Sequence, residues 1–225
     1  MKLPISDRLL ACARFIAPGD RVADIGCDHG YLAIYALTTG LASSVIAADI
    51  GEGPLQSALH NSVKYGVRDK IEFYLSDGVR NIPRDFNTLV CAGMGGDTMI
   101  HILESAPWLR KTQYRMILQC QSKTPMLRKY LSETGWRITE ESVLKDGRFL
   151  YTVMEVRWEP DYPMLTEAEC WFPPAMLVNP GPDLKAYFQW VVRGLEIATE
   201  HQEDEEKKRV LAVLHGHPDF AFLRD

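Results

Sequence analysis

The stretch Ala23-Asp-Ile-Gly-Cys-Asp-His-Gly-Tyr31 decides the fold class of this chain. It begins inside the apolar run Arg21–Ile25, which has the length and composition of a short buried strand, and a helical pattern follows it. A strand, a glycine turn and a helix in that order are typical of a nucleotide-binding loop. A dinucleotide fingerprint would place glycines at 26, 28 and 31, but this chain has Gly26, Asp28 and Tyr31. The loop therefore predicts a parallel α/β sheet whose ligand tolerates a carboxylate.

Composition and the distribution of cysteines limit the class of protein to which this chain can belong. The chain has 225 residues, of which 46% are hydrophobic and 24% charged, as in an ordinary globular protein. No apolar stretch approaches the roughly 18–20 residues of a membrane span, and Asp7 and Arg8 interrupt the first 18 residues, so we expect no secretory signal and no membrane association. The five cysteines are scattered and form no C-x-x-C pair. These features predict a reduced, cytoplasmic protein with no metal site.

Strand and helix patterns alternate along the first 158 residues. The expected strands are 21–25, 44–49, 70–75, 88–92, 115–119, 136–143 and 150–158, and the expected helices are 6–16, 29–39, 53–65, 96–103 and 124–135. The turn Lys145–Arg148 joins the last two strands as a hairpin. We therefore expect a seven-stranded, mostly parallel Rossmann-like sheet with a C-terminal antiparallel hairpin and helices on both faces.

The C-terminal third has a different pattern. Residues 159–182 contain six prolines, which indicate a linker. From Asp183 onward, apolar residues recur at spacings of three and four, and we expect a helical hairpin over about 183–214 whose apolar stripe packs on its own partner helix. This divides the chain into a domain at 1–160 and a Pro-rich linker with a small, coiled-coil-like helical domain at 161–225. The oligomeric state stays open, with a monomer favoured.

Candidate ligand groups follow several strands, at the sheet edge where open parallel sheets bind ligands. Asp49 ends the second strand and could accept hydrogen bonds from two ribose hydroxyls, and Asp77 after the third could accept from an adenine amino group. Each carboxylate alone could instead cap a turn. Asp28 disfavours a diphosphate and suits a sulfonium cofactor, which points to S-adenosylmethionine. The predicted cofactor-binding residues are Asp24, Gly26, Asp28, Gly30, Asp49, Ile50, Asp77, Gly78 and Gly93.

At this point the chain resembles the bacterial TrmK family of Rossmann-like methyltransferases. The resemblance rests on Ala23–Tyr31, on Ala92-Gly-Met-Gly-Gly96, on Ile117-Leu-Gln119 and on the helical C-terminal appendage. It implies methyl transfer from S-adenosylmethionine to N1 of an adenine in the D-arm region of tRNA, adenine 22 in that family. The chain departs from the family at Cys120, where a proline is expected, and this affects the shape of the base pocket.

The chemistry of methyl transfer leaves two hypotheses for the role of Asp28. It could stabilise the target adenine, by accepting from its N6 amine or by acting as general base, or it could only hold the amino group of the cofactor. Gly93–Gly96 replace the Asn/Asp-Pro-Pro-aromatic motif common in methyltransferases that modify exocyclic amines, which favours a ring nitrogen as acceptor. Met94 could pack on a base or in the core, and Gln119 is a further candidate at the base pocket.

Residues 107–148 carry nine basic and four acidic residues, a net charge of +5 in a chain whose net charge is −5. This segment is the candidate tRNA surface, and we expect its basic residues near the carboxyl edge of the sheet, where the target base must enter. It could instead be only a solvated basic face. The predicted substrate-binding residues are Met94, Gln119, Arg110, Lys111, Lys123, Arg128 and Lys129. Two rival functions remain: a small-molecule methyltransferase of the same fold, with 159–182 as a lid, and a non-catalytic RNA-binding module, which would not need Asp49 and Asp77.

Overall fold

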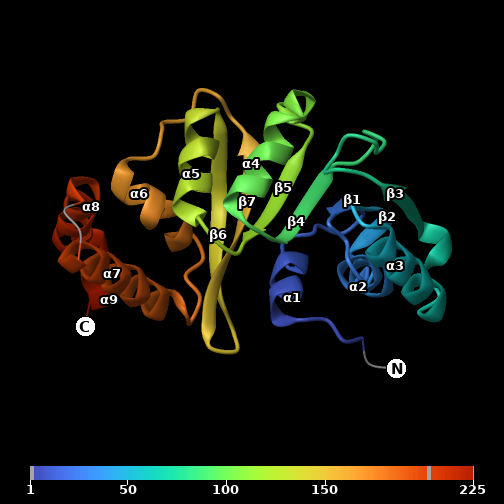
Figure 1. Cartoon of the computed structure of the whole chain (residues 1–225), viewed down its shortest axis with the longest axis horizontal. Coiled ribbons are helices and arrows are strands. Elements are labelled where there is room, and N and C mark those ends of the chain that lie inside the picture. The colour runs from blue at the N-terminus through green and yellow to red at the C-terminus, as the bar shows by residue number, and fades with distance from the viewer. Residues whose placement is uncertain (1–2, 202–203, 225) are drawn as a thin grey trace.

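A seven-stranded sheet forms the centre of the computed structural model, which describes residues 3–201 and 204–224. The strand order is β3-β2-β1-β4-β5-β7-β6 (Figure 1). The strands are β1 Asp20–Ile25, β2 Ala42–Asp49, β3 Ile71–Leu75, β4 Thr88–Met94, β5 Arg115–Cys120, β6 Trp136–Asp146 and β7 Phe149–Trp158. Strands β1 to β5 pair in parallel, whereas β7 pairs antiparallel with β5 and with β6. The predicted sheet, including its terminal hairpin, is confirmed.

Helices cover both faces of this sheet. They are α1 Asp7–Ala13, α2 Tyr31–Thr38, α3 Glu52–Lys64, α4 Gly96–Glu104 and α5 Thr124–Glu133. Because side chains alternate along a strand, Ala23 and Ile25 pack in the core with α4 and α5, and Val22 packs in the core with α1 and α2. The chain runs outward from β1 to β3 on one side and from β4 on the other. The strand order thus reverses between β1 and β4, where open α/β sheets form a ligand crevice.

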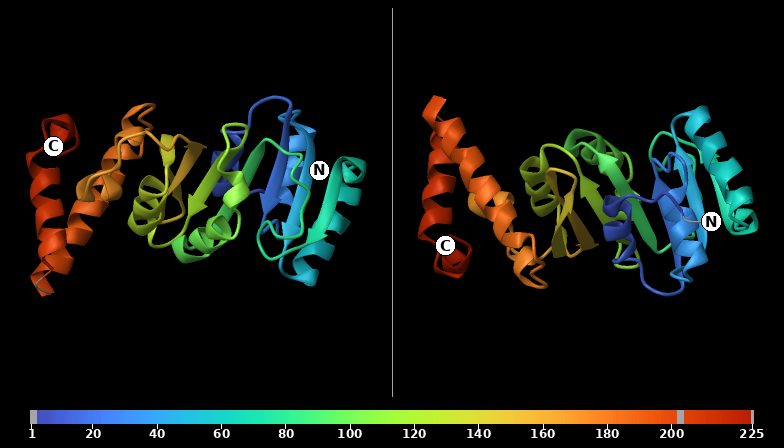
Figure 2. Two further views of the ribbon diagram at one scale, coloured as in Figure 1. Left: turned by 90° about the horizontal axis from the view of Figure 1, so that it is seen from above. Right: turned by 90° about the horizontal axis from the view of Figure 1, so that it is seen from below.

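The C-terminal helices form a separate layer beside β6 (Figure 2). They are α6 Glu167–Trp171, α7 Leu184–His201, α8 Glu205–Gly216 and α9 Ala221–Arg224. The apolar stripe of α7 packs against Val210 and Leu214 of α8, as predicted, and also against Val143 of β6. The segment read as a linker is folded: it contains α6 and a 3-10 helix at Pro174–Leu177, and Phe172 is fully buried in the same cluster. The proposed division at residue 160 stays a prediction.

A buried ion pair fastens this C-terminal layer to the sheet. The Arg128 guanidinium donates to both oxygens of Glu141 at 3.1 and 2.7 Å, and both side chains are fully buried. Arg128 also donates to the carbonyls of Cys170 and Trp171 and to the hydroxyl of Tyr187. The prediction that Arg128 contacts tRNA is therefore wrong, because every direction its guanidinium can donate in is taken up by the protein interior.

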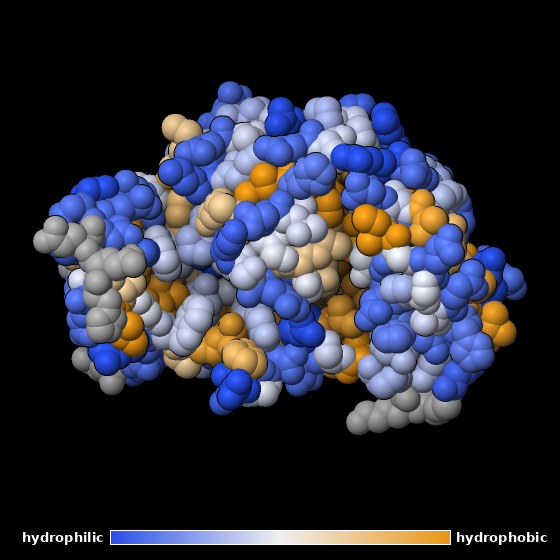
Figure 3. Space-filling model, viewed as in Figure 1, coloured by the Kyte–Doolittle hydropathy of each residue, from blue (hydrophilic) through white to orange (hydrophobic). Residues whose placement is uncertain are grey.

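Hydrophilic residues cover most of the face shown in Figure 3, and hydrophobic residues gather mainly near its middle. None of the helices in the described ranges is long and apolar enough to cross a bilayer. Within those same ranges, no cluster of three or more His, Cys, Asp or Glu side chains could hold a metal ion.

Candidate functional site

The loop after β1 is held in a conformation that few residues adopt. Gly26, Asp28 and Gly30 have φ values of 74°, 49° and 71°, in the left-handed region. The Gly26 N–H donates to the Ala48 carbonyl of the neighbouring strand at 2.8 Å. The Asp28 N–H donates to Oδ2 of Asp49 at 3.0 Å. The loop is therefore fixed by β2 from both its backbone and its terminal carboxylate, and α2 begins two residues later than expected.

Two of these glycines lie close to neighbouring side chains. A Cβ at Gly26 would lie 2.4 Å from Cε of Met94, so a side chain there would push the flexible tip of Met94 aside, and the positive φ would add backbone strain. A Cβ at Gly30 would lie 3.0 Å from Cβ of Ala58 on α3. Gly26 thus keeps the space over the loop open, and Gly30 lets α2 and α3 approach.

Asp24 is the buried carboxylate of the site. It is 4% exposed, and its Oδ2 has no hydrogen-bond partner among the described residues. Burial, reinforced by the negative charge of Asp49 and partly offset by the Ala33 backbone N–H, raises the pKa of Asp24 to about 7. A cationic ligand group beside Asp24 would satisfy this oxygen and favour its ionised form.

Asp49 lies at the carboxyl end of β2 and is 9% exposed. Its Oδ2 accepts from Asp28 and its Oδ1 accepts from the Gly51 N–H at 2.9 Å. Each carboxylate oxygen can accept a second bond, so both remain able to bind a hydroxyl pair. Ile50 beside it is 74% exposed and leaves an apolar surface open at this edge of the sheet.

At the end of the third strand, the candidate ligand group is already paired within the protein. Asp77 forms an exposed ion pair with Arg80 at 2.9 Å, and the assignment of Asp77 to an adenine amino group stays a prediction. Gly78 has a φ of 59°, and a Cβ there would lie 2.9 Å from Cγ1 of Ile102. Gly78 is therefore required for the turn to pack on α4, whatever else it contacts.

Strand β4 continues through Gly93 to Met94, two residues farther than the sequence predicts. The register of β4 against β5 shifts between Ala92 and Met94, and Gly93 has a φ of 81°. The buried Gln119 accepts from the Gly93 N–H at 3.0 Å and donates to the Cys120 carbonyl at 3.1 Å. Gln119 therefore shapes the site mainly by holding Gly93. The Cys120 thiol donates to the Ser122 carbonyl at 3.0 Å, filling the position where the family resemblance led us to expect proline.

A cleft of about 500 Å³ joins the ends of β1, β4 and β5. It brings together six predicted site residues: Asp24, Gly26, Asp28, Gly93, Met94 and Gln119. Asp49, Ile50, Asp77 and Gly78 do not line this cleft and follow β2 and β3 at the same edge of the sheet.

The sequence gives no indication that α1 contributes to this cleft. Arg8 lines it, donates to Oδ2 of Asp146 at 2.9 Å and lies 5.5 Å from the ring centre of Tyr151. Tyr31 and Gln121 line it as well. Only the helix pattern near Arg8 was visible in the sequence, because its contact with the hairpin turn joins residues 138 positions apart.

The basic residues do not form one surface. Lys123 follows β5 at the carboxyl edge, pairs with Asp97 at 2.5 Å and is 58% exposed, and Lys129 is exposed on α5. Arg110 and Lys111 precede β5 and so lie toward the opposite edge, about 20 Å away along a six-residue strand. The prediction that all of them lie near the target's entrance is therefore wrong for Arg110 and Lys111.

A family model described as a methyltransferase domain matches residues 5–154. The tRNA (adenine(22)-N(1))-methyltransferase of Bacillus subtilis is 33% identical over 154 residues, which are 68% of this chain and 65% of that protein. The crystal structure of the B. subtilis m1A22 tRNA methyltransferase TrmK superposes with a TM-score of 0.80 at 26% identity, covering 100% of both chains.

A Streptococcus pneumoniae structure, described as a candidate tRNA (m1A22) methyltransferase in complex with S-adenosyl-L-methionine, superposes with a TM-score of 0.80 at 30% identity. It covers 92% of this chain and 99% of that one. By sequence alone, the matched segment spans less than two thirds of the curated B. subtilis relative, whereas the structural likeness extends through the C-terminal helices.

Proposed function

The chain belongs to the methyltransferase-domain family, and on that premise we propose that it transfers a methyl group from S-adenosylmethionine to N1 of an adenine in tRNA. By likeness to the B. subtilis enzyme, adenine 22 is the expected target. A tRNA substrate would place the protein in the cytoplasm, and we expect it to act as a monomer.

One observation carries the proposal. The family model ends at residue 154, but the likeness to the B. subtilis tRNA methyltransferase covers the whole of both chains. The C-terminal helices therefore belong to the shared architecture and not to a generic methyltransferase domain. Their stripe is buried in a core shared with β6, so their remaining surface is available to a large substrate.

The residues of the cleft fit the proposed cofactor. Asp24 has an unpaired oxygen suited to an ammonium group, and Asp49 has free lone pairs suited to ribose hydroxyls. The glycines at 26 and 93 leave space that a Cβ would fill or strain. S-adenosylmethionine supplies an electrophilic methyl group on a positively charged sulfur. No phosphate is present to be repelled by Asp28, which agrees with a carboxylate in this loop.

Adenine N1 carries a free lone pair, so no proton has to leave before the new N–C bond forms and the C–S bond breaks. The methylated base becomes cationic. The exposed carboxylate of Asp28 lies at the cleft, and it would accept a hydrogen bond from the N6 amine and stabilise the positive charge that develops. It could then take the N6 proton as a general base. Gly93, held by Gln119, would let the base approach the backbone closely.

Incubation with radiolabelled S-adenosylmethionine and bulk tRNA, followed by nucleoside analysis, tests the proposal. We expect labelled 1-methyladenosine, and none when tRNA is omitted. A transcript in which guanosine replaces adenine 22 is the matched substrate control and should accept no label. Label in N6-methyladenosine, or no label in any tRNA, would contradict the proposal.

A further inference from the structure

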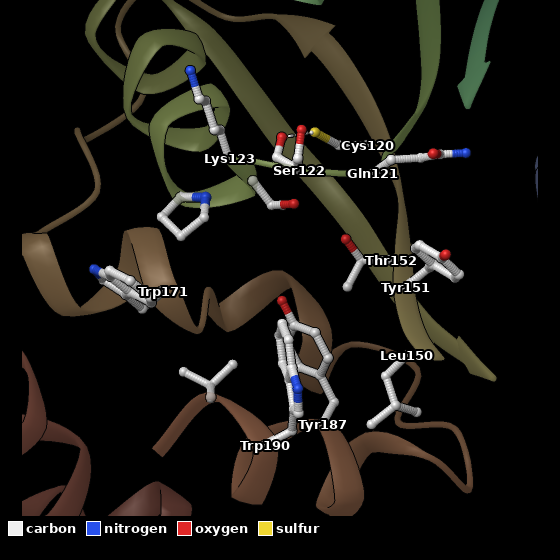
Figure 4. Close-up of a pocket in the computed structure, with 13 residues that line it drawn as sticks. Cys120, Gln121, Ser122, Lys123, Leu150, Tyr151, Thr152, Trp171, Tyr187 and Trp190 are labelled. Atoms are coloured by element: carbon white, nitrogen blue, oxygen red, sulfur yellow. Dashed lines mark hydrogen bonds between the residues drawn. The ribbon is translucent and has the colours of Figure 1, made fainter. Parts of the chain in front are cut away.

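A second pocket, of about 300 Å³, lies between the methyltransferase sheet and the C-terminal helices (Figure 4). Its upper wall is the segment after β5 that carries Gln121 and Lys123. Thr152 of β7 lies on one side, and Trp171, at the end of α6, lies on the other. Trp190 of α7 closes the bottom. The volume is at the lower end of the range of about 300–1,000 Å³ found for small-ligand sites, which suits a single flat ring system.

Trp190 is an exposed aromatic on a rigid support. Trp190 is 61% exposed, yet its ring packs on Tyr187 with ring centres 5.7 Å apart. The Tyr187 hydroxyl accepts a hydrogen bond from the buried Arg128 at 3.2 Å, so Tyr187 cannot turn away. A large aromatic surface held in place at a pocket rim favours stacking of a ligand ring.

A buried hydroxyl in the pocket wall sets a second requirement for the ligand. Thr152 is 2% exposed, and its hydroxyl has no hydrogen-bond partner in the described part of the chain. Lys123 also lines the pocket, but its ammonium points away from Trp190 and Thr152 in Figure 4 and pairs with Asp97 at 2.5 Å. A ligand with a flat ring and hydrogen-bonding edges would satisfy both the Trp190 ring and the Thr152 hydroxyl.

The pocket adjoins the proposed catalytic cleft. Gln121 lines both, and its backbone N–H donates to the carbonyl of Met94 in the cleft at 2.9 Å. A chain of nucleotides with one residue in the cleft would therefore reach this pocket with its neighbour.

We propose that the pocket holds an unpaired base of the RNA substrate, adjacent in sequence to the target adenine, stacked on Trp190 with a hydrogen-bonding edge at the Thr152 hydroxyl. This inference rests on the proposed function. Stacking of splayed bases on aromatic side chains is a common way for proteins to bind single-stranded RNA. The pocket would hold the strand open while the target base occupies the cleft.

Trp190→Ala tests the stacking directly. Because stacking on one aromatic side chain contributes roughly 1–3 kcal/mol per base, we expect the tRNA dissociation constant to rise about 5-fold or more. Trp190→Phe should restore most of the affinity, and S-adenosylmethionine affinity should stay unchanged. Phe222→Ala is the matched control, because Phe222 is 59% exposed on α9 and lies away from the pocket.

Fluorescence of 2-aminopurine, placed in the transcript on either side of the target adenine, provides a second readout. We expect binding of the parent protein to change the emission of 2-aminopurine at one of the two flanking positions. Binding of Trp190→Ala should leave the emission at that position as it is in the free transcript. If the parent methylates tRNA but Trp190→Ala binds it as tightly and leaves the emission change intact, the pocket inference alone is wrong. If the parent methylates no tRNA, the proposed function is wrong and the inference falls with it.

Discussion

The backbone N–H of Asp28 donates to Oδ2 of Asp49 at 3.0 Å, so the carboxylate that ends β2 fixes the loop that ends β1. The same carboxylate accepts from Gly51 through its other oxygen. Asp49 thus has two tasks at this edge of the sheet. It sets the backbone at Asp28, and it presents lone pairs to the proposed ribose.

Asp49→Ala should weaken S-adenosylmethionine binding by roughly 2–3 kcal/mol, because two charge-assisted hydrogen bonds to the ligand are lost together with the support of the loop. Isothermal titration calorimetry measures this change. Asp85→Ala is the control, since Asp85 is 68% exposed and pairs with Arg21 outside the site. Unchanged affinity in Asp49→Ala would remove Asp49 from the site.

The sheet and the carboxylate positions could be predicted because they depend on local patterns. Buried strands show apolar runs, and Asp24 and Asp49 each lie at or near the end of such a run. Once the strands are taken as parallel, their carboxyl ends must share one edge. Gly26 and Gly93 were identified for the same reason, although the extension of β4 to Met94 depends on a bulge that the sequence does not reveal.

The basic residues could not be placed by the same reasoning. Arg110 and Lys123 both lie close to β5 in the sequence, but one precedes the strand and the other follows it, and strand polarity separates them. Arg128 was predicted to bind the substrate, and nothing local indicated that Glu141, 13 residues away, would pair with it in the interior. Arg8 reaches the cleft through a contact that only the tertiary structure creates.

Asp24 gives the unfolding free energy a specific pH dependence. Its pKa is raised from 3.8 in the unfolded chain to about 7 by burial and by Asp49, so the folded protein holds a proton that the unfolded chain releases between about pH 4 and 7. Stability from this group is therefore lost as pH rises through that range, by at most roughly 4 kcal/mol. Asp24→Asn should remove the loss. Urea unfolding should show that the unfolding free energy of Asp24→Asn rises relative to that of the parent between pH 5 and pH 8. The same difference in unfolding free energy at both pH values would contradict the raised pKa of Asp24.

The two basic groups should differ in their effect on tRNA binding. Lys123→Gln combined with Lys129→Gln should weaken binding and reduce the salt dependence of the association constant by about one to two units of slope, as expected for two lost phosphate contacts. Arg110→Gln combined with Lys111→Gln removes the same charge at the opposite edge of the sheet and should have little effect. Filter binding at several salt concentrations measures both. Equal slopes for the two double variants would mean that only net charge matters.

Arg128 should affect folding and not RNA recognition. Arg128→Ala leaves the Glu141 charge buried without a partner and should lower the unfolding free energy by about 3–5 kcal/mol. Arg128→Met with Glu141→Leu removes both charges and should recover much of that loss. Chemical denaturation compares the variants. A double variant less stable than Arg128→Ala would show that the bonds from Arg128 to the Cys170 and Trp171 carbonyls contribute more than the ion pair.

Substitutions of Asp28 distinguish the two hypotheses about its role, contact with the target adenine and contact with the cofactor. Its φ of 49° is tolerated by Asn and Gly but strains Ala, so Asp28→Asn and Asp28→Gly test the carboxylate without disturbing the backbone bond to Asp49. If Asp28 stabilises the target adenine, both variants should bind S-adenosylmethionine within a few-fold of the parent. Single-turnover methylation should then fall by about 10²-fold or more, as for one lost electrostatic or acid–base contact. Should affinity for the cofactor fall in proportion to the rate, Asp28 is a cofactor ligand. Should neither change, the Asp28 carboxylate is structural, and the stabilising groups must be sought in the Gly93–Gly96 backbone held by Gln119.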